Sequence, residues 1–202
     1  MKSDSIRIAN CSGFYGDKLS IARDMIEGGP IDVLTGDYLA ELTMTILYNQ
    51  RLKRGEQHGY VGTFLKQFRD IAKLAQEKNI KIVTNAGGLN PSSMAESVKE
   101  IIDELNLDLK VAHIEGDDLM PRIDELYQGG ENLTNIDKSL DLQKYEKKPI
   151  TANAYLGAWG IKEALDNGAD VVICPRVTDA AVVIGPAAWK YNWSRDQYDE
   201  LA

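Results

Sequence analysis

The sequence predicts an α/β fold with a mainly parallel, doubly wound, Rossmann-like sheet that carries helices on both faces. Three observations support this fold class. Short apolar runs alternate with longer segments whose apolar residues recur at helical spacing. Polar, glycine-rich segments follow most of the apolar runs, as loops do at the ends of parallel strands. The length of 202 residues is close to that of one domain, so we expect residues 1–202 to form a single α/β domain.

Four strands and four helices are predicted in the first half of the chain. The strands are expected at residues 6–9, 31–34, 80–84 and 107–113. The helices are expected at residues 19–26, 37–47, 64–75 and 91–105. Gly28-Gly29-Pro30 ends the first of these helices, and Asp37 is expected to cap the second.

The second half of the chain repeats this alternation after a polar interval. Strands are expected at 150–152 and 171–173, which brings the predicted total to six. A helix between them should end at Asn167-Gly168, where glycine suits the position after the last turn. A last helix is expected at 180–189, and Gly185-Pro186 should kink or end it.

The polar interval, residues 116–148, is an excursion from the domain. It is rich in Asp, Glu, Lys and Asn, and its apolar positions are scattered apart from a short predicted helix near 118–127. A solvated connection is the favoured interpretation, and a lid or an interface loop are the alternatives.

Composition excludes several classes of function. Acidic residues outnumber basic ones by 31 to 23, which gives a net charge of −8 and disfavours nucleic-acid binding. The sequence contains no apolar run of membrane-spanning length and no signal peptide, so we expect a cytoplasmic protein that does not enter a membrane. Two cysteines and two distant histidines provide no disulfide framework and no metal signature. The sequence does not identify a cofactor, and the use of a metal or coenzyme stays open.

The candidate site is predicted at the carboxyl edge of the sheet. Polar loops follow the strands at residues 10–17, 35–38, 85–90, 153–155 and 175–179. In an open parallel sheet these loops share one edge, where helix N-termini offer free N–H groups to ligands.

Three side chains in these loops are candidate catalytic groups: Asp37, Asp179 and Cys11. Asp37 and Glu41, one helical turn apart, suit acid–base work or a divalent cation, whereas a capped, solvated helix start is the simpler interpretation. Cys11 would be a nucleophile if a helix N-terminus lowered its pKa, and a buried, inert thiol is the favoured alternative.

A second set of residues is expected to contact an anionic small molecule. The set comprises Ser12, Gly13, Asn85, Gly87, Gly88, Asn153 and Arg176. The glycines allow close backbone approach, and Asn85 offers both a donor and an acceptor. Arg176 can clamp a carboxylate or phosphate with two hydrogen bonds, and a structural pair with Asp179 is the alternative.

Five segments, in order, carry a resemblance to a known family. They read GFYGD at 13–17, DYLAELTM at 37–44, TNAGGLNP at 84–91, ANAYLG at 152–157 and GADVVI at 168–173. Together they resemble the N-terminal domain of the acyclic terpene utilisation family, AtuA, over roughly residues 6–202. The resemblance implies a role in the breakdown of acyclic terpenes such as citronellol and geraniol, by a route through coenzyme A thioesters. It also implies that the family domain continues beyond Ala202.

The resemblance and the loops together predict an enzyme, or an enzyme component, of acyclic terpene or branched acyl catabolism. It would bind an anionic small molecule, such as an acyl-CoA, and Asp37 or Asp179 would serve a hydratase- or lyase-type step. The alternative is a non-catalytic binding module, either a homo-oligomer or a subunit that needs a partner chain. Trp189 and Trp193 motivate that alternative, because they suit an interface.

Overall fold

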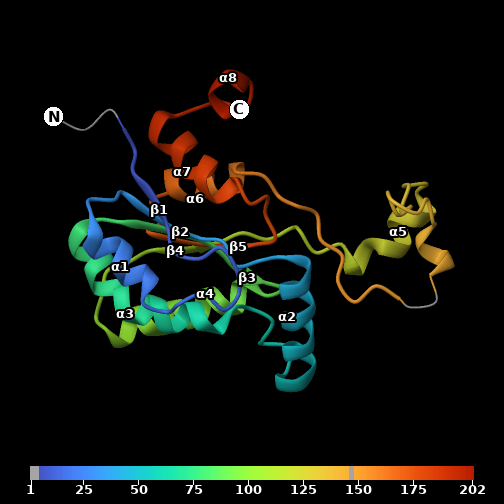
Figure 1. Cartoon of the computed structure of the whole chain (residues 1–202), viewed down its shortest axis with the longest axis horizontal. Helices are drawn as coiled ribbons and strands as arrows, with labels where there is room; N and C mark the ends of the chain where they lie inside the picture. Colours follow the sequence, from blue (N-terminus) through green and yellow to red (C-terminus); the bar gives the residue numbers. More distant parts are fainter. Residues whose placement is uncertain (1–4, 146–147) are drawn as a thin grey trace.

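A computed structural model describes residues 5–145 and 148–202 and shows one parallel sheet between two layers of helices (Figure 1). The strands are β1 (Ile8–Asn10), β2 (Val33–Gly36), β3 (Lys81–Gly88), β4 (Val111–His113) and β5 (Val171–Pro175). Their order in the sheet is β1-β2-β3-β5-β4, and all neighbouring pairs are parallel. The predicted α/β fold with a parallel sheet is therefore confirmed.

The helices cover both faces of the sheet. They are α1 (Ile21–Gly28), α2 (Glu41–Arg54), α3 (Gly62–Lys78), α4 (Pro91–Glu104), α5 (Ile123–Gln128), α6 (Trp159–Asp166), α7 (Ala181–Tyr191) and α8 (Tyr198–Leu201). Figure 1 shows α1, α3 and α4 below the sheet and α6 and α7 above it. Among the described residues, no helix is both long and apolar enough to cross a bilayer.

The alternation of side chains along the strands divides the core into two layers. Leu34 and Ile82 pack with α1, α3 and α4 on one face of the sheet. Their neighbours Val33 and Val83 pack with α6 and α7 on the other face. Because strands β2, β3 and β5 are buried on both sides, they consist of apolar runs rather than of alternating polar and apolar residues.

Two strand predictions are wrong. Residues 150–152 form no strand of the sheet; instead the Ala152 carbonyl accepts a hydrogen bond from the Leu119 N–H, and Asn153 forms an isolated antiparallel bridge with Asp118. This segment pairs with the chain that leaves β4, and so it cannot join the parallel sheet. Strand β3 also runs past Thr84 to Gly88, where a loop was expected, and its register with β5 shifts between these two residues.

The prediction for the start of α2 is wrong, and for α7 one of the two alternatives, an end at Gly185-Pro186, is excluded. Ala40, not Asp37, precedes α2, and its N–H donates to Thr43 Oγ1. Asp37 lies three residues before this cap because Asn85 binds both its carboxylate and the next N–H, which holds residues 37–38 outside the helix. Helix α7 does not end at Gly185-Pro186 but continues to Tyr191, with Gly185 packed closely against Ile161 of α6.

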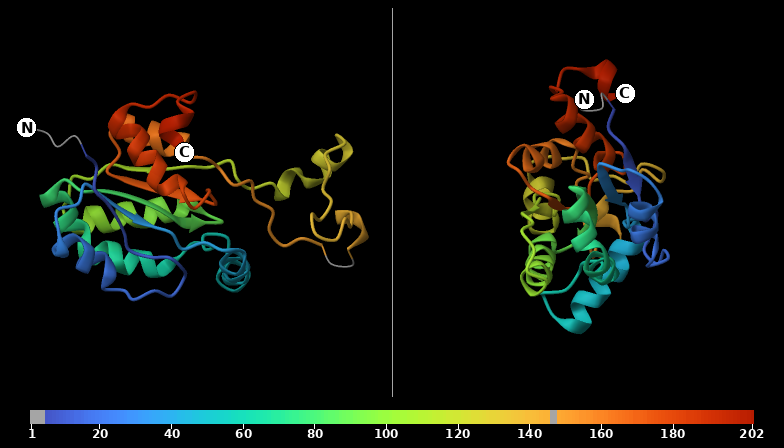
Figure 2. Two further views of the ribbon diagram at one scale, coloured as in Figure 1. Left: turned by 45° about the horizontal axis from the view of Figure 1, so that its top comes forward. Right: turned by 90° about the vertical axis from the view of Figure 1, so that its left-hand side faces the viewer.

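Residues 116–145 and 148–149 project from the body of the protein, and we call them the arm (Figures 1 and 2). The arm contains α5, two 3-10 turns (Met120–Arg122 and Leu142–Lys144) and a bridge between Thr134 and Asp141. Among its described residues only Asp117, at the base, is buried. The described part of the arm therefore has no apolar core of its own.

Candidate functional site

The candidate site lies at the carboxyl edge of the sheet, beside the neighbouring strands β3 and β5. The helix after β3 is α4, which packs on one face of the sheet. The helix after β5 is α7, which packs on the other face. Adjacent strands whose connections turn to opposite faces leave a crevice between them, and ligands of open α/β sheets bind at such a position.

Arg176, the first residue after β5, is the centre of this region. Its side chain is only 5% exposed. Nη1 donates to the Leu39 carbonyl at 2.7 Å and to Asp179 Oδ1 at 3.4 Å, and the guanidinium carbon lies 4.1 Å from the Tyr155 ring centroid. The predicted structural pair with Asp179 is thus present, and Arg176 links the loops that follow β2 and β5.

The hydrogen-bonding capacity of Arg176 is incompletely used. Its Nε is buried and has no hydrogen-bond partner among the described residues. Nη2 lies 3.9 Å from Glu41 Oε1, which is an ion-pair distance but too long for a hydrogen bond. Nε and Nη2 form the edge of a guanidinium that binds a carboxylate or phosphate with two parallel bonds, so the unsatisfied edge is the one suited to an anion.

Glu41 and Tyr155 lie over the guanidinium. The Tyr155 hydroxyl donates a short hydrogen bond to Glu41 Oε1, which lowers the pKa of that carboxyl. Both side chains are exposed, and Glu41 is 81% exposed, so moving them requires no disruption of the core. Glu41 and Tyr155 therefore form an exposed cover over Arg176.

Asp37 is the candidate acid–base group with the most perturbed environment. Partial burial raises the pKa of its carboxyl, and the charge of Asp179 acts in the same direction. The Asn85 amide donates to Asp37 Oδ1 at 2.5 Å, and the Asn85 oxygen accepts the Tyr38 N–H at 2.8 Å. Asn85 is completely buried, so it positions Asp37 rather than facing a ligand.

Asp117 is a buried carboxylate that the sequence analysis missed. Its Oδ2 accepts hydrogen bonds from the Arg176 N–H at 3.2 Å and from Asn153 Nδ2 at 2.8 Å. Burial raises the pKa of Asp117 despite these bonds. The signal was available, because Asp117 closely follows β4 and the carboxyl-edge rule applies to that strand too. Asn153 is linked to the site through Asp117, because the Asn153 amide donates a hydrogen bond to the Asp117 carboxylate.

The first loop is already hydrogen-bonded within itself. The Gly13 N–H donates to Asp17 Oδ2 at 2.8 Å, and Ser12 Oγ donates to the Phe14 carbonyl. Burial raises the pKa of Cys11 to about 11, so its thiol is neutral near pH 7. The Cys11 Sγ lies 3.9 Å from the Tyr38 hydroxyl oxygen. This geometry supports the inert-thiol alternative for Cys11 and leaves no free N–H at Gly13 for an anion.

Gly87 and Gly88 face protein atoms. A Cβ on Gly87 would lie 2.6 Å from the Cys174 carbonyl oxygen, and one on Gly88 would lie 2.4 Å from Leu47 Cδ1. Gly88 also has a φ of +54°, which glycine adopts at little cost. Both glycines permit close packing of β3 against its neighbours.

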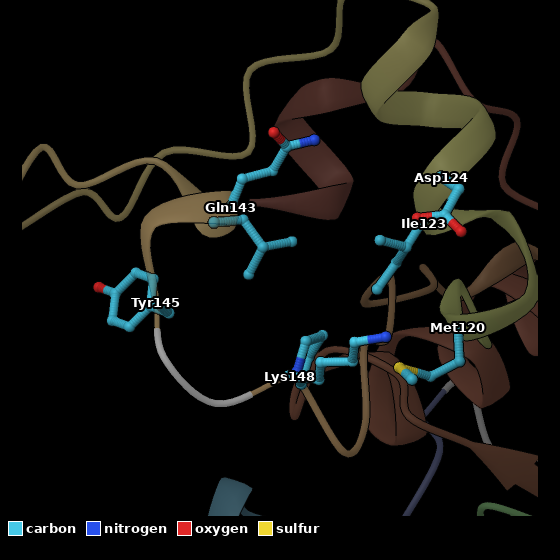
Figure 3. Close-up of a pocket in the computed structure, with 8 residues that line it drawn as sticks. Met120, Ile123, Asp124, Gln143, Tyr145 and Lys148 are labelled. Atoms are coloured by element: carbon cyan, nitrogen blue, oxygen red, sulfur yellow. The ribbon is translucent and has the colours of Figure 1, made fainter.

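A separate cavity lies on the arm (Figure 3). Its volume is about 550 Å³, and it is lined by Met120, Ile123, Asp124, Leu142, Gln143, Tyr145, Lys148 and Pro149. None of these residues belongs to the carboxyl-edge region. In the part of the chain that the structure describes, no three His, Cys, Asp or Glu side chains are placed to hold a metal ion.

Asp37→Asn should make the protein more stable than wild type at pH 7. The folded state binds the Asp37 proton more tightly than the unfolded state, whose aspartate pKa is about 3.9. The stabilisation that the protonated Asp37 provides is fully present below the unfolded pKa of about 3.9, and it is lost as pH rises through the raised pKa of the folded state. The gain of Asp37→Asn over wild type should therefore grow between about pH 4 and pH 7.

Urea unfolding at several pH values measures this gain. Asp108→Asn is the matched control, since it removes an exposed carboxylate before β4, at the opposite edge of the sheet, and should change the profile less. A gain that is constant with pH would contradict a raised pKa at Asp37.

Comparison with known proteins gives one match. The model of the acyclic terpene utilisation family protein AtuA matches residues 6–202. No curated protein matches the chain, and no solved structure does so either. Because the family match covers nearly the whole sequence, the chain belongs to the acyclic terpene utilisation family, AtuA.

Proposed function

We propose that this chain is an enzyme, or an enzyme component, that acts on an anionic intermediate of acyclic terpene or branched acyl breakdown. The observation that carries this proposal is the buried Arg176 guanidinium, whose Nε has no partner among residues 5–145 and 148–202. A buried unsatisfied donor is costly, and an acceptor from a ligand removes that cost. A phosphate of an acyl-CoA supplies such an acceptor.

The chemistry fits a hydratase- or lyase-type step. Asp37 stands close enough to Asp179 and Arg176 for their charges to act on its carboxyl. A carboxyl group with a raised pKa can hold a proton and return it. Addition of water across the Cα–Cβ double bond of an enoyl thioester requires such a group, because the water oxygen bonds to Cβ and loses a proton to a base while Cα gains a proton from an acid; removal of water is the reverse. Asp37 is therefore the proposed acid–base group, with Asp179 as the second carboxylate.

A thermal-shift titration with isovaleryl-CoA, citronellyl-CoA, free CoA, ATP and NAD tests the binding. A ligand at 100 times its Kd stabilises the folded state by about 2.7 kcal/mol. For a chain of this size we expect the Tm to rise by about 5–10 °C with the acyl-CoAs. Nucleotides alone should give a smaller shift.

Arg176→Lys keeps the charge but loses the two-donor edge, so its acyl-CoA shift should largely disappear. Asp37→Asn should retain the shift and lose turnover once the substrate is known. An equal shift in Arg176→Lys, or no shift with any acyl-CoA, would overturn the proposal. Unchanged turnover in both Asp37→Asn and Asp179→Asn would remove these residues from the acid–base role.

A second candidate function is a subunit or binding module that needs a partner. The arm favours it, because the arm projects from the body without an apolar core (Figure 2). A chain that binds acyl-CoA but turns nothing over until a second protein is added would support this candidate. Turnover by the isolated chain would exclude it.

A further inference from the structure

The arm exposes apolar surface that this chain does not cover. Ile136 is 95% exposed, and Met120 and Tyr145 are each more than one-third exposed. No apolar side chain among the described residues of the arm is buried. The cavity of about 550 Å³ is an open groove between α5 and the turn at 142–144, and Ile123 points into it (Figure 3).

The chain exposes more surface than a compact protein of its mass. The chain exposes 11633 Å², whereas a compact protein of 22.4 kDa is expected to expose about 9,400 Å². The excess is about 2,200 Å² for each chain. Obligate homodimers commonly bury about 2,000–5,000 Å² in total, so a dimer in which both chains cover this excess lies in the usual range.

Charge identifies which surface fits the groove. Residues 116–149 contain eight acidic and five basic side chains, a net charge of −3, and the groove is lined by both Asp124 and Lys148. The last turn of α2 is basic, with Arg51, Lys53 and Arg54. Between these cations Leu52 is 66% exposed. Leu52 therefore suits the apolar side chains that line the groove, and the cations around Leu52 suit the net negative charge of the arm.

Within the described chain, Lys53 and Arg54 form no ion pair with another residue. Helix α2 and the arm leave the body at the same end of the molecule but stand apart from each other in Figure 1 and in the left-hand view of Figure 2. A two-fold dimer in which each arm receives the α2 of the other chain would cover both surfaces at once.

We propose that the arm groove holds the basic C-terminal turn of α2 from a second copy of this chain, in a two-fold dimer. Leu52 of one copy packs against Ile123 of the other, and Lys53 and Arg54 face the acidic arm. The arm begins and ends beside Asp117 and Asn153, so this contact also fixes the edge of the candidate site. The dimer does not depend on the proposed activity, because mass and cross-linking are measured without a substrate.

Light scattering after gel filtration should give twice the chain mass of 22.4 kDa. Leu52→Cys combined with Ile123→Cys should form a disulfide-linked dimer on a non-reducing gel. Native Cys11 and Cys174 are buried and should not compete. Leu52→Cys combined with Lys73→Cys is the matched control, because Lys73 lies exposed on α3, and it should remain monomeric on the gel.

Reversing the charges tests the same contact in solution. Lys53→Glu with Arg54→Glu should raise the dimer dissociation constant about tenfold or more. Lys73→Glu with Lys99→Glu changes the net charge equally and should alter it less than about twofold, since these charges lie away from the contact. A monomer at all concentrations, a cross-link in the control pair, or a monomer whose groove is filled by decanoate would overturn the proposal.

Discussion

Gly87→Ala is expected to lower the free energy of unfolding by about 2–4 kcal/mol. The new Cβ would lie 2.6 Å from the Cys174 carbonyl oxygen and 2.9 Å from the Pro91 Cα. Both are main-chain atoms, one in the neighbouring strand β5 and one at the start of α4, so neither can rotate away. Relief requires β3 and β5 to separate, which disturbs packing at the centre of the sheet.

Urea unfolding of the variant and of wild type at one pH measures this loss. Gly13→Ala is the matched control, because a Cβ at that position meets no atom within 4 Å. We expect its free energy of unfolding to stay within about 0.5 kcal/mol of wild type. If Gly87→Ala were as stable as Gly13→Ala, the close approach of β3 to β5 would be refuted.

Asp117→Ala is expected to lower the free energy of unfolding by about 2–4 kcal/mol. The substitution leaves two donors without an acceptor: the Arg176 N–H, which is buried, and Asn153 Nδ2, which is half-buried. Each unsatisfied buried donor costs about 1–3 kcal/mol. Removing the buried charge itself offsets part of this cost, since burial disfavours the ionised form of Asp117.

Asp117→Asn separates these effects. Its amide oxygen can still accept one hydrogen bond and it carries no charge, so we expect less than half of the loss seen for Asp117→Ala. Limited proteolysis is a second measurement, because the Asp117 carboxylate ties the start of the arm to Asn153, which closely follows the end of the arm. Faster cleavage in the arm of Asp117→Ala, but not of Asp117→Asn, is the expected pattern. An equal free energy of unfolding for Asp117→Ala and wild type would show that the Asp117 carboxylate does not stabilise the fold.

Local sequence pattern predicted most of the elements correctly, because burial on two faces leaves a clear apolar run. Val171, Val172 and Ile173 are such a run, and they lie in a central strand. The same pattern failed for residues 150–152, where a short apolar run pairs with the chain leaving β4. The local sequence does not distinguish residues 171–173 from residues 150–152, because the difference lies in which segment each of them pairs with.

For the candidate site too, the sequence pattern located residues correctly but did not identify their hydrogen-bond partners. The carboxyl-edge rule identified Asp37, Arg176 and Asp179 from their places after strands, and these three side chains do gather near one another. The same rule selected Gly13, Gly87 and Asn85, yet protein groups already occupy all three. The Gly13 N–H donates to Asp17, and the space beside Gly87 is filled by Cys174 and Pro91. The Asn85 amide donates to Asp37.

The sequence by itself determined the fold class, the family and the loops that lie at the carboxyl edge. These follow from the order of apolar runs and motifs along the chain, which is a local property. Tertiary structure alone decided which polar groups remain unsatisfied, because that depends on acceptors from distant segments. The buried Nε of Arg176, the displaced Asp37 and the carboxylate of Asp117 were therefore found only once the strands were placed side by side.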